Sequence, residues 1–128
     1  MADPLTVLIV DDHPVVRQGL RVLLEVHDGL EVAGEAADGE EALALAEEHA
    51  GRIDLLISDV IMPGLDGPTL LKKARPFLGS AQVMFISGYA EAEFSDLLEG
   101  EEGVTFLPKP IDIKILAERV KLQLQATA

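Results

Sequence analysis

The chain has 128 residues, no cysteine, and 23 acidic against 10 basic residues, which gives a formal net charge of −13. This length fits a single domain over residues 1–128, the lack of cysteine excludes disulfides and thiolate metal sites, and the negative charge argues against direct nucleic-acid binding. No apolar run approaches the ~20 residues of a membrane-spanning helix and no signal peptide follows Met1, so we expect a cytoplasmic domain without membrane contact.

Short apolar runs predict five strands. Residues 5–10 form the first run, which is interrupted only by Thr6 and is rich in branched side chains. Such a pattern is typical of a strand that is buried on both faces of a sheet. Similar runs follow at residues 30–33, 55–58, 83–87 and 104–107.

Amphipathic segments between these runs predict five helices, at residues 15–26, 40–49, 69–78, 91–98 and 113–124. Asp38 is the expected N-cap of the second helix, and Glu41 completes a capping box. The alternation of strands and helices predicts an α/β fold with a doubly wound parallel sheet, right-handed crossovers and helices on both faces.

Two neighbouring apolar stripes run along the first predicted helix. The stripe suited to the core consists of Val16, Leu20, Leu23 and Leu24. The second stripe consists of Val15, Gly19, Val22 and Val26. Together they are wider than the roughly 100° that a core-facing helix needs. The second stripe is therefore either partly buried by neighbouring elements or available to a partner helix.

Polar side chains gather where the predicted strands end. Asp11 and Asp12 follow the first strand, Asp59 the third, Ser87 ends the fourth, and Lys109 follows the fifth. In open parallel sheets, ligands bind beyond the carboxyl ends of the strands. Three carboxylates at one edge repel one another unless a cation neutralises them, and oxygen ligands favour Mg²⁺. With Lys109 and the Ser87 hydroxyl to stabilise charge, the group suits phosphoryl transfer to Asp59.

Several neighbours of this group have ordinary structural explanations. An Asp-Asp pair is often a helix cap and a Lys-Pro dipeptide is usually a turn, so each residue alone is weak evidence for a site. His13 beside the acidic pair is interpreted as an exposed capping or packing residue and is left out of the site. The combination of residues at the strand ends carries the prediction.

Four segments resemble the signature segments of two-component response-regulator receiver domains. They are VLIVDD at residues 7–12, LLISDVIMPGLDG at 55–67, FISGY at 85–89 and LPKP at 107–110. The resemblance covers nearly the whole chain. It implies a flavodoxin-like (βα)5 fold with strand order 2-1-3-4-5, and a phosphorelay in which Asp59 accepts a phosphoryl group from a phosphohistidine and then relays it or switches conformation.

The resemblance also implies roles for individual residues. Mg²⁺, for which Mn²⁺ can substitute, would be bound by Asp11, Asp12, Asp59 and the backbone carbonyl of Ile61. Ser87 and Lys109 would contact the phosphoryl group. Phe106 stands at the aromatic switch position, which is coupled to the hydroxyl at Ser87, although a phenylalanine there is equally explained as a core residue.

The two halves of the chain resemble different branches of the family. Residues 7–48 resemble receivers of the NarL/LuxR class, and residues from 54 onward resemble the receiver of hybrid histidine kinases of the CckA type. A chimera with a seam at residues 50–53 or ordinary divergence would explain this. The implied partner is the helical domain of a histidine kinase or of a histidine phosphotransferase. The domain is expected to be a monomer or a weak dimer. If the parent protein is a membrane-bound hybrid kinase, the domain would be tethered to that kinase.

Other functions are less compatible with the residues. A phosphohydrolase of the haloacid dehalogenase type needs a second acid two positions after the nucleophile, where this chain has Ile61. A flavin-binding module needs a phosphate loop rich in Ser, Thr and Gly after the first strand, where this chain is acidic. A receiver-like interaction module that is never phosphorylated stays open. We therefore expect a phosphoacceptor that assists its own phosphorylation and dephosphorylation, not a turnover enzyme.

Overall fold

The computed structural model describes residues 5–26, 30–59, 64–79, 81–87, 104–108 and 118, with backbone alone for residues 87 and 106–108. The strands are β1 (Leu5–Val10), β2 (Leu30–Ala36), β3 (Leu55–Asp59), β4 (Gln82–Ser87) and β5 (Val104–Pro108). The helices with described bounds are α1 (Pro14–Glu25), α2 (Gly39–Glu48) and α3 (Gly67–Leu78).

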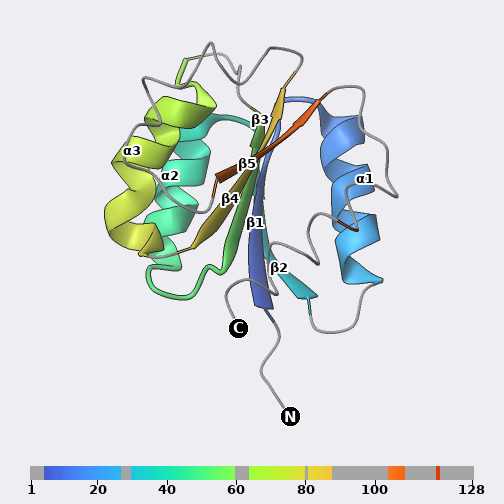
Figure 1. The fold of residues 1–128 in the computed structure, drawn as a ribbon, viewed down its shortest axis with the longest axis horizontal. Coiled ribbons are helices and arrows are strands. Elements are labelled where there is room, and N and C mark those ends of the chain that lie inside the picture. The colour runs from blue at the N-terminus through green and yellow to red at the C-terminus, as the bar shows by residue number, and fades with distance from the viewer. Residues whose placement is uncertain are drawn as a thin grey trace.

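All pairings in the five-stranded sheet are parallel, and the strand order is β2-β1-β3-β4-β5. Both the parallel sheet and the strand order are as predicted. The first strand, β1, is an inner strand of the sheet, with β2 on one side and β3 on the other (Figure 1). Val10 pairs with Ser58, so the residues that follow β1 lie beside the end of β3.

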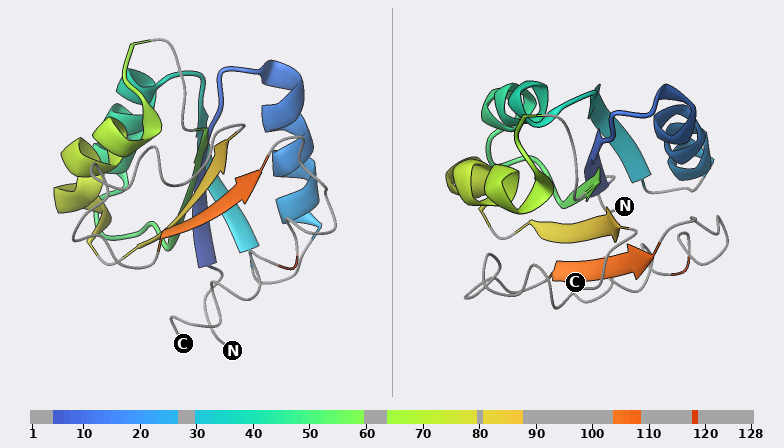
Figure 2. Two further views of the ribbon diagram at one scale, coloured as in Figure 1. Left: turned by 45° about the horizontal axis from the view of Figure 1, so that its top comes forward. Right: turned by 90° about the horizontal axis from the view of Figure 1, so that it is seen from above.

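The helices cover the two faces of the sheet. Helices α2 and α3 lie on one face and α1 lies on the other (Figures 1 and 2). Alternate strand residues therefore enter different cores. The core under α2 and α3 includes Leu8, Val10, Leu56, Val83 and Phe85. The core under α1 includes Val7, Ile9, Leu55, Ile57 and Ile86.

The predicted elements mostly agree with the structure at their centres and differ at their ends. Strand β2 continues to Ala36, three residues beyond its apolar run, because residues 34–36 pair with the backbone of β1. The helix predicted at 91–98 lies outside the described residues, and of residues 113–124 only Glu118 is described, in helical conformation. Across the described ranges, no helix is both long and apolar enough to cross a membrane.

The second apolar stripe of α1 faces solvent. Val15 is 83% exposed, Val22 57% and Val26 71%, and a Cβ on Gly19 would meet no atom within 4 Å. Leu20 and Leu24, from the first stripe, are buried against the sheet. The neighbouring elements therefore do not bury these valines. Of the two explanations for the second stripe, only its use as a surface for a partner helix is left.

Asp38 caps α2 as predicted, because its carboxylate accepts a hydrogen bond from the backbone N–H of Glu41 at 2.8 Å. Replacing Asp38 with alanine removes this acceptor and is expected to lower the free energy of unfolding by about 1 kcal/mol. Urea denaturation of both proteins measures the difference. Asp38→Ser keeps a capping oxygen and should recover most of the loss; an equal loss in both variants would contradict a capping role.

Candidate functional site

The backbone beyond β1 is held in place from two sides. The N–H of Asp11 donates to the carbonyl of Ala36 at 3.0 Å, which continues the β1–β2 pairing by one residue. Its carbonyl accepts a hydrogen bond from the Arg17 guanidinium at 2.6 Å. Pro14 then starts α1, with His13 at the N-cap in extended conformation. These contacts fix the loop that carries Asp11 and Asp12.

Salt bridges connect α1 with β2 next to this loop. The guanidinium of Arg17 lies 3.5 Å from Glu35 of β2, and Arg21 contacts both Glu35 and Glu25. The hydrogen bond to Glu25, and next in size the one to Glu35, raise the pKa of Arg21 above its ordinary value. Since Arg21 is fully charged at neutral pH in either case, these salt bridges serve to anchor α1 beside β2.

Asp59 is the last residue of β3, and its side chain is only 3% exposed. The backbone around it is confined. The buried Ser58 hydroxyl donates to the Asp59 carbonyl oxygen at 2.8 Å. A Cβ on Gly67 would lie 2.6 Å from that same oxygen and 2.8 Å from a ring carbon of Phe85. Glycine at position 67 therefore lets the start of α3 approach the carboxyl end of β3.

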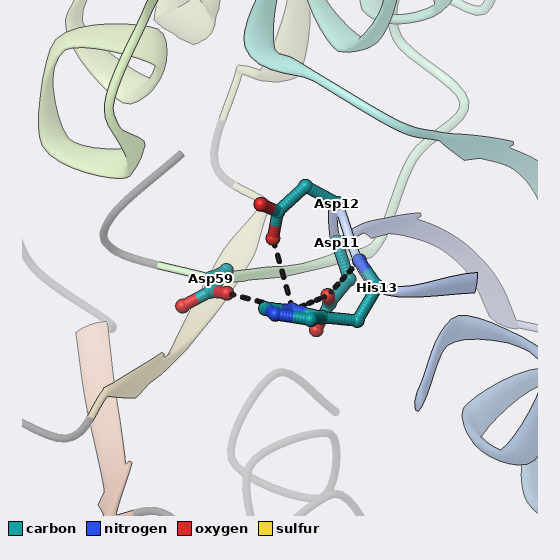
Figure 3. A group of neighbouring side chains, drawn as sticks. All are labelled: Asp11, Asp12, His13 and Asp59. Atoms are coloured by element: carbon teal, nitrogen blue, oxygen red, sulfur yellow. Dashed lines mark hydrogen bonds and ion pairs between the residues drawn. The ribbon is translucent and has the colours of Figure 1, made fainter. Parts of the chain in front are cut away.

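Four side chains meet at this edge of the sheet: Asp11, Asp12, His13 and Asp59, which offer ligand atoms within 4.8 Å of one another. Figure 3 shows them pointing toward a common centre, three from the loop after β1 and one from β3. The Nδ1 atom of His13 lies 3.0 Å from Oδ1 of Asp11, 3.0 Å from Oδ1 of Asp12 and 3.9 Å from Oδ2 of Asp59.

Two oxygens of this cluster are buried without a hydrogen-bond donor among the described residues, namely Oδ2 of Asp11 and Oδ1 of Asp12. Buried carboxylate oxygens normally accept hydrogen bonds or bind a cation. Three carboxylates so close also repel one another. Both observations fit a divalent cation with a preference for oxygen ligands, such as Mg²⁺.

The structure describes some of the predicted site residues and not others. It brings Asp11, Asp12 and Asp59 together as the strand-end argument requires. The backbone of Ser87 ends β4 and pairs with Pro108 of β5, and Phe106 pairs with Phe85. The side chains of Ser87 and Phe106 are not described. Both Ile61 and Lys109 lie outside the described residues.

His13 is interpreted from the sequence as an exposed capping or packing residue outside the site. Its exposure is confirmed, because 59% of its side chain is exposed, and its exclusion from the site stays a prediction. Its side chain makes no capping hydrogen bond, although the residue occupies the N-cap position. Instead the ring contacts Asp11 and Asp12, while the His13 N–H donates to Oδ1 of Asp11 at 2.7 Å. The available signal was its place directly after two site acids at a helix start, where the chain turns back toward the strand end.

Comparison with known proteins agrees with this geometry. The family model for the response regulator receiver domain matches residues 7–121. The chain belongs to this family. The sensor kinase CckA of Brucella abortus is 44% identical over 125 residues, which cover 94% of this chain and 12% of the kinase. The nitrate/nitrite response regulator NarP of Escherichia coli is 36% identical over 122 residues, which cover 94% of this chain and 55% of NarP.

Solved receiver structures have the same fold. A crystal structure of the receiver domain of the hybrid histidine kinase CckA is 65% identical, with a TM-score of 0.80 over 93% of this chain and 98% of that one. A chain in the CheX–CheY–BeF3–Mg²⁺ complex from Borrelia burgdorferi is 34% identical, with a TM-score of 0.81 over 94% of this receiver and 89% of that chain. These likenesses agree with the flavodoxin-like expectation.

The receiver spans only part of its curated relatives, 12% of the CckA kinase and 55% of NarP. Relatives of both predicted kinds, CckA and NarP, each match 94% of the chain, so both matches extend across residues 50–53. A seam between two origins stays a prediction.

Proposed function

We propose that this receiver accepts a phosphoryl group from a phosphohistidine onto Asp59, with Mg²⁺ bound, and then relays it or switches conformation. The observation that carries the proposal is the cluster of the buried Asp11 and Asp59 with the partly buried Asp12, in which two carboxylate oxygens have no donor among the described residues. Membership of the receiver family supports it. So does the presence of Mg²⁺ and BeF3 in the complex of the similar CheY.

The proposed reaction forms one bond and breaks one. A carboxylate oxygen of Asp59 attacks phosphorus, the P–N bond to the donor histidine breaks, and the departing imidazole nitrogen takes the electron pair and picks up a proton. The product is an acyl phosphate on Asp59. Its carboxylate stands at the end of a buried strand, so the nucleophile is held in position before the donor arrives.

The chain's own residues divide the remaining work. Asp11 and Asp12 would hold Mg²⁺ together with Asp59 and the Ile61 carbonyl, and Mn²⁺ would serve in its place. When bound, the ion neutralises charge on the transferring phosphoryl oxygens. Ser87 would donate to one of these oxygens and Lys109 would place its ammonium group near another, as electrostatic stabilisation requires.

A conformational output would start at Ser87. Strand β4, which ends at Ser87, pairs with β5, which contains Phe106, so the two proposed switch residues stand on adjacent strands. Movement of the Ser87 hydroxyl toward a new phosphoryl group would free space for the Phe106 ring. Such a local charge event biases a two-state element in the way that other phosphorylation switches do.

The exposed stripe of α1 is the surface that we propose for the donor protein. Val15, Val22 and Val26 form an apolar strip on the helix that starts beside the site. A helical domain of a histidine kinase or histidine phosphotransferase would cover it and bring its phosphohistidine to Asp59. With a net charge of −13, nucleic acid is an unfavourable partner. We propose a cytoplasmic monomer or weak dimer that performs no turnover reaction.

Phosphorylation is tested by the intact mass of the protein after incubation with acetyl phosphate and Mg²⁺. We expect a gain of one phosphoryl group, lost in Asp59→Asn and when Mg²⁺ is chelated. Glu47→Gln removes one exposed carboxylate from α2 and should leave the gain unchanged. No gain in the folded wild-type protein would reject the proposal in favour of a receiver-like interaction module, and release of free phosphate at catalytic rates would favour a phosphohydrolase.

A further inference from the structure

The ring of His13 occupies a place in the acid cluster that suits a metal ligand. Its Nδ1 is 3.0 Å from an oxygen of Asp11 and 3.0 Å from an oxygen of Asp12. Adjacent ligands of an octahedral ion with bonds of ~2.1 Å lie ~3 Å apart. The Nδ1 atom therefore sits at the distance from both oxygens that neighbouring vertices of one coordination shell would have.

A hydrogen bond alone does not satisfy this arrangement. One N–H on Nδ1 serves a single acceptor well, and Oδ1 of Asp12 accepts no hydrogen bond among the described residues despite its 3.0 Å separation from that nitrogen. Oδ2 of Asp11, on a side chain only 1% exposed, likewise has no described donor. A cation between the four groups would contact the nitrogen and the carboxylates together.

We propose that Nδ1 of His13 is a fourth side-chain ligand of the metal site, beside the three carboxylates, so that the site binds borderline divalent ions such as Ni²⁺, Co²⁺ and Zn²⁺ in addition to Mg²⁺. The inference rests on the proposed function, since it uses the same three carboxylates. Imidazole nitrogen favours these transition ions, whereas Mg²⁺ prefers oxygen and water. Because the His13 side chain is 59% exposed, it has room to turn away when Mg²⁺ is bound.

The test is calorimetric titration of the whole chain with Ni²⁺ and, separately, with Mg²⁺. His13→Ala is expected to weaken Ni²⁺ binding by at least about tenfold and to change Mg²⁺ binding by less than about threefold, because Mg²⁺ gains little from nitrogen. His49→Ala is the matched control. His49 follows the C-terminal end of α2, before the amino end of β3, and its loss should change neither affinity.

A spectroscopic measurement separates direct ligation from positioning. Mn²⁺ accepts both oxygen and imidazole ligands, and pulsed electron paramagnetic resonance of the Mn²⁺-loaded protein should show ¹⁴N coupling that disappears in His13→Ala and persists in His49→Ala. Absence of ¹⁴N coupling in the wild type would overturn the proposal. Equal loss of Ni²⁺ and Mg²⁺ affinity in His13→Ala, or no loss of either, would also overturn it.

The two proposals fail in different ways. If Asp59 is phosphorylated with Mg²⁺ but Ni²⁺ affinity does not depend on His13, the ligand role of His13 is wrong and the receiver function stands. If the wild type takes no phosphoryl group with Mg²⁺ yet binds Ni²⁺ through His13, the metal site stands and the phosphoacceptor function is wrong.

Discussion

Replacing Asp12 with asparagine is expected to raise the free energy of unfolding of the metal-free protein by about 1 kcal/mol. The substitution keeps the shape of the side chain while it removes one of three close negative charges and places an amide donor within the acid cluster. Thermal denaturation in the presence of a chelator should show a melting temperature higher by about 4 °C.

The same substitution should remove most of the stabilisation that Mg²⁺ binding gives to the folded protein. At an Mg²⁺ concentration of ~100 Kd, the wild type should gain about 2.7 kcal/mol from binding, and Asp12→Asn should gain little because a ligand is lost. Glu40→Gln, an exposed neutralisation at the start of α2, is the control and should stay within about 0.5 kcal/mol of the wild type in either condition. A metal-free Asp12→Asn that is less stable than the wild type would contradict repulsion within the cluster.

Replacing Gly67 with alanine is expected to lower the free energy of unfolding by about 1 to 3 kcal/mol, as overpacking does in a close-packed interior. The new Cβ would lie 2.6 Å from the Asp59 carbonyl oxygen and 2.8 Å from the Phe85 ring. Backbone and a buried aromatic cannot yield cheaply, so α3 or the end of β3 must shift. We expect slower phosphorylation as well, since the nucleophile belongs to the displaced residue.

Gly19→Ala provides the matched control for this change. A Cβ at Gly19 meets nothing within 4 Å, and the residue lies in the middle of α1. The substitution should stabilise the protein by about 0.5 to 1 kcal/mol through helix propensity. Urea denaturation and the rate of phosphorylation by acetyl phosphate measure both variants. Wild-type stability and rate in Gly67→Ala would show that the close approach to Asp59 has no consequence.

Much of the fold could be predicted because each strand interior is a short apolar run between amphipathic helices. The meeting of Asp11 and Asp59 followed from the same pattern, since the carboxyl ends of neighbouring parallel strands share an edge. The C-terminal end of β2, at Ala36, could not be predicted from the apolar run. Residues 34–36 join the sheet through backbone pairing with β1. Only Ala36 among them has an apolar side chain, so they do not extend the apolar run of residues 30–33.

The contribution of His13 depends on three-dimensional detail that spacing does not carry. Its ring reaches the cluster because the residue is extended at the N-cap, with φ −101° and ψ 107°, before Pro14 starts the helix. The requirement for glycine at position 67 also could not be predicted from the sequence. A glycine after an acidic residue is typical of many turns, and only the packing of α3 against β3 shows that a side chain there would strike the Asp59 backbone.

The central claim is that Asp59 carries the phosphoryl group. Borohydride reduction after incubation with acetyl phosphate and Mg²⁺ converts an aspartyl phosphate to homoserine, and peptide mass spectrometry then locates the modified residue. We predict homoserine at position 59 in the wild type and none in the Asp59→Asn variant. A phosphoryl group recovered on another residue, or a phosphorylated wild type with unmodified Asp59, would contradict the account.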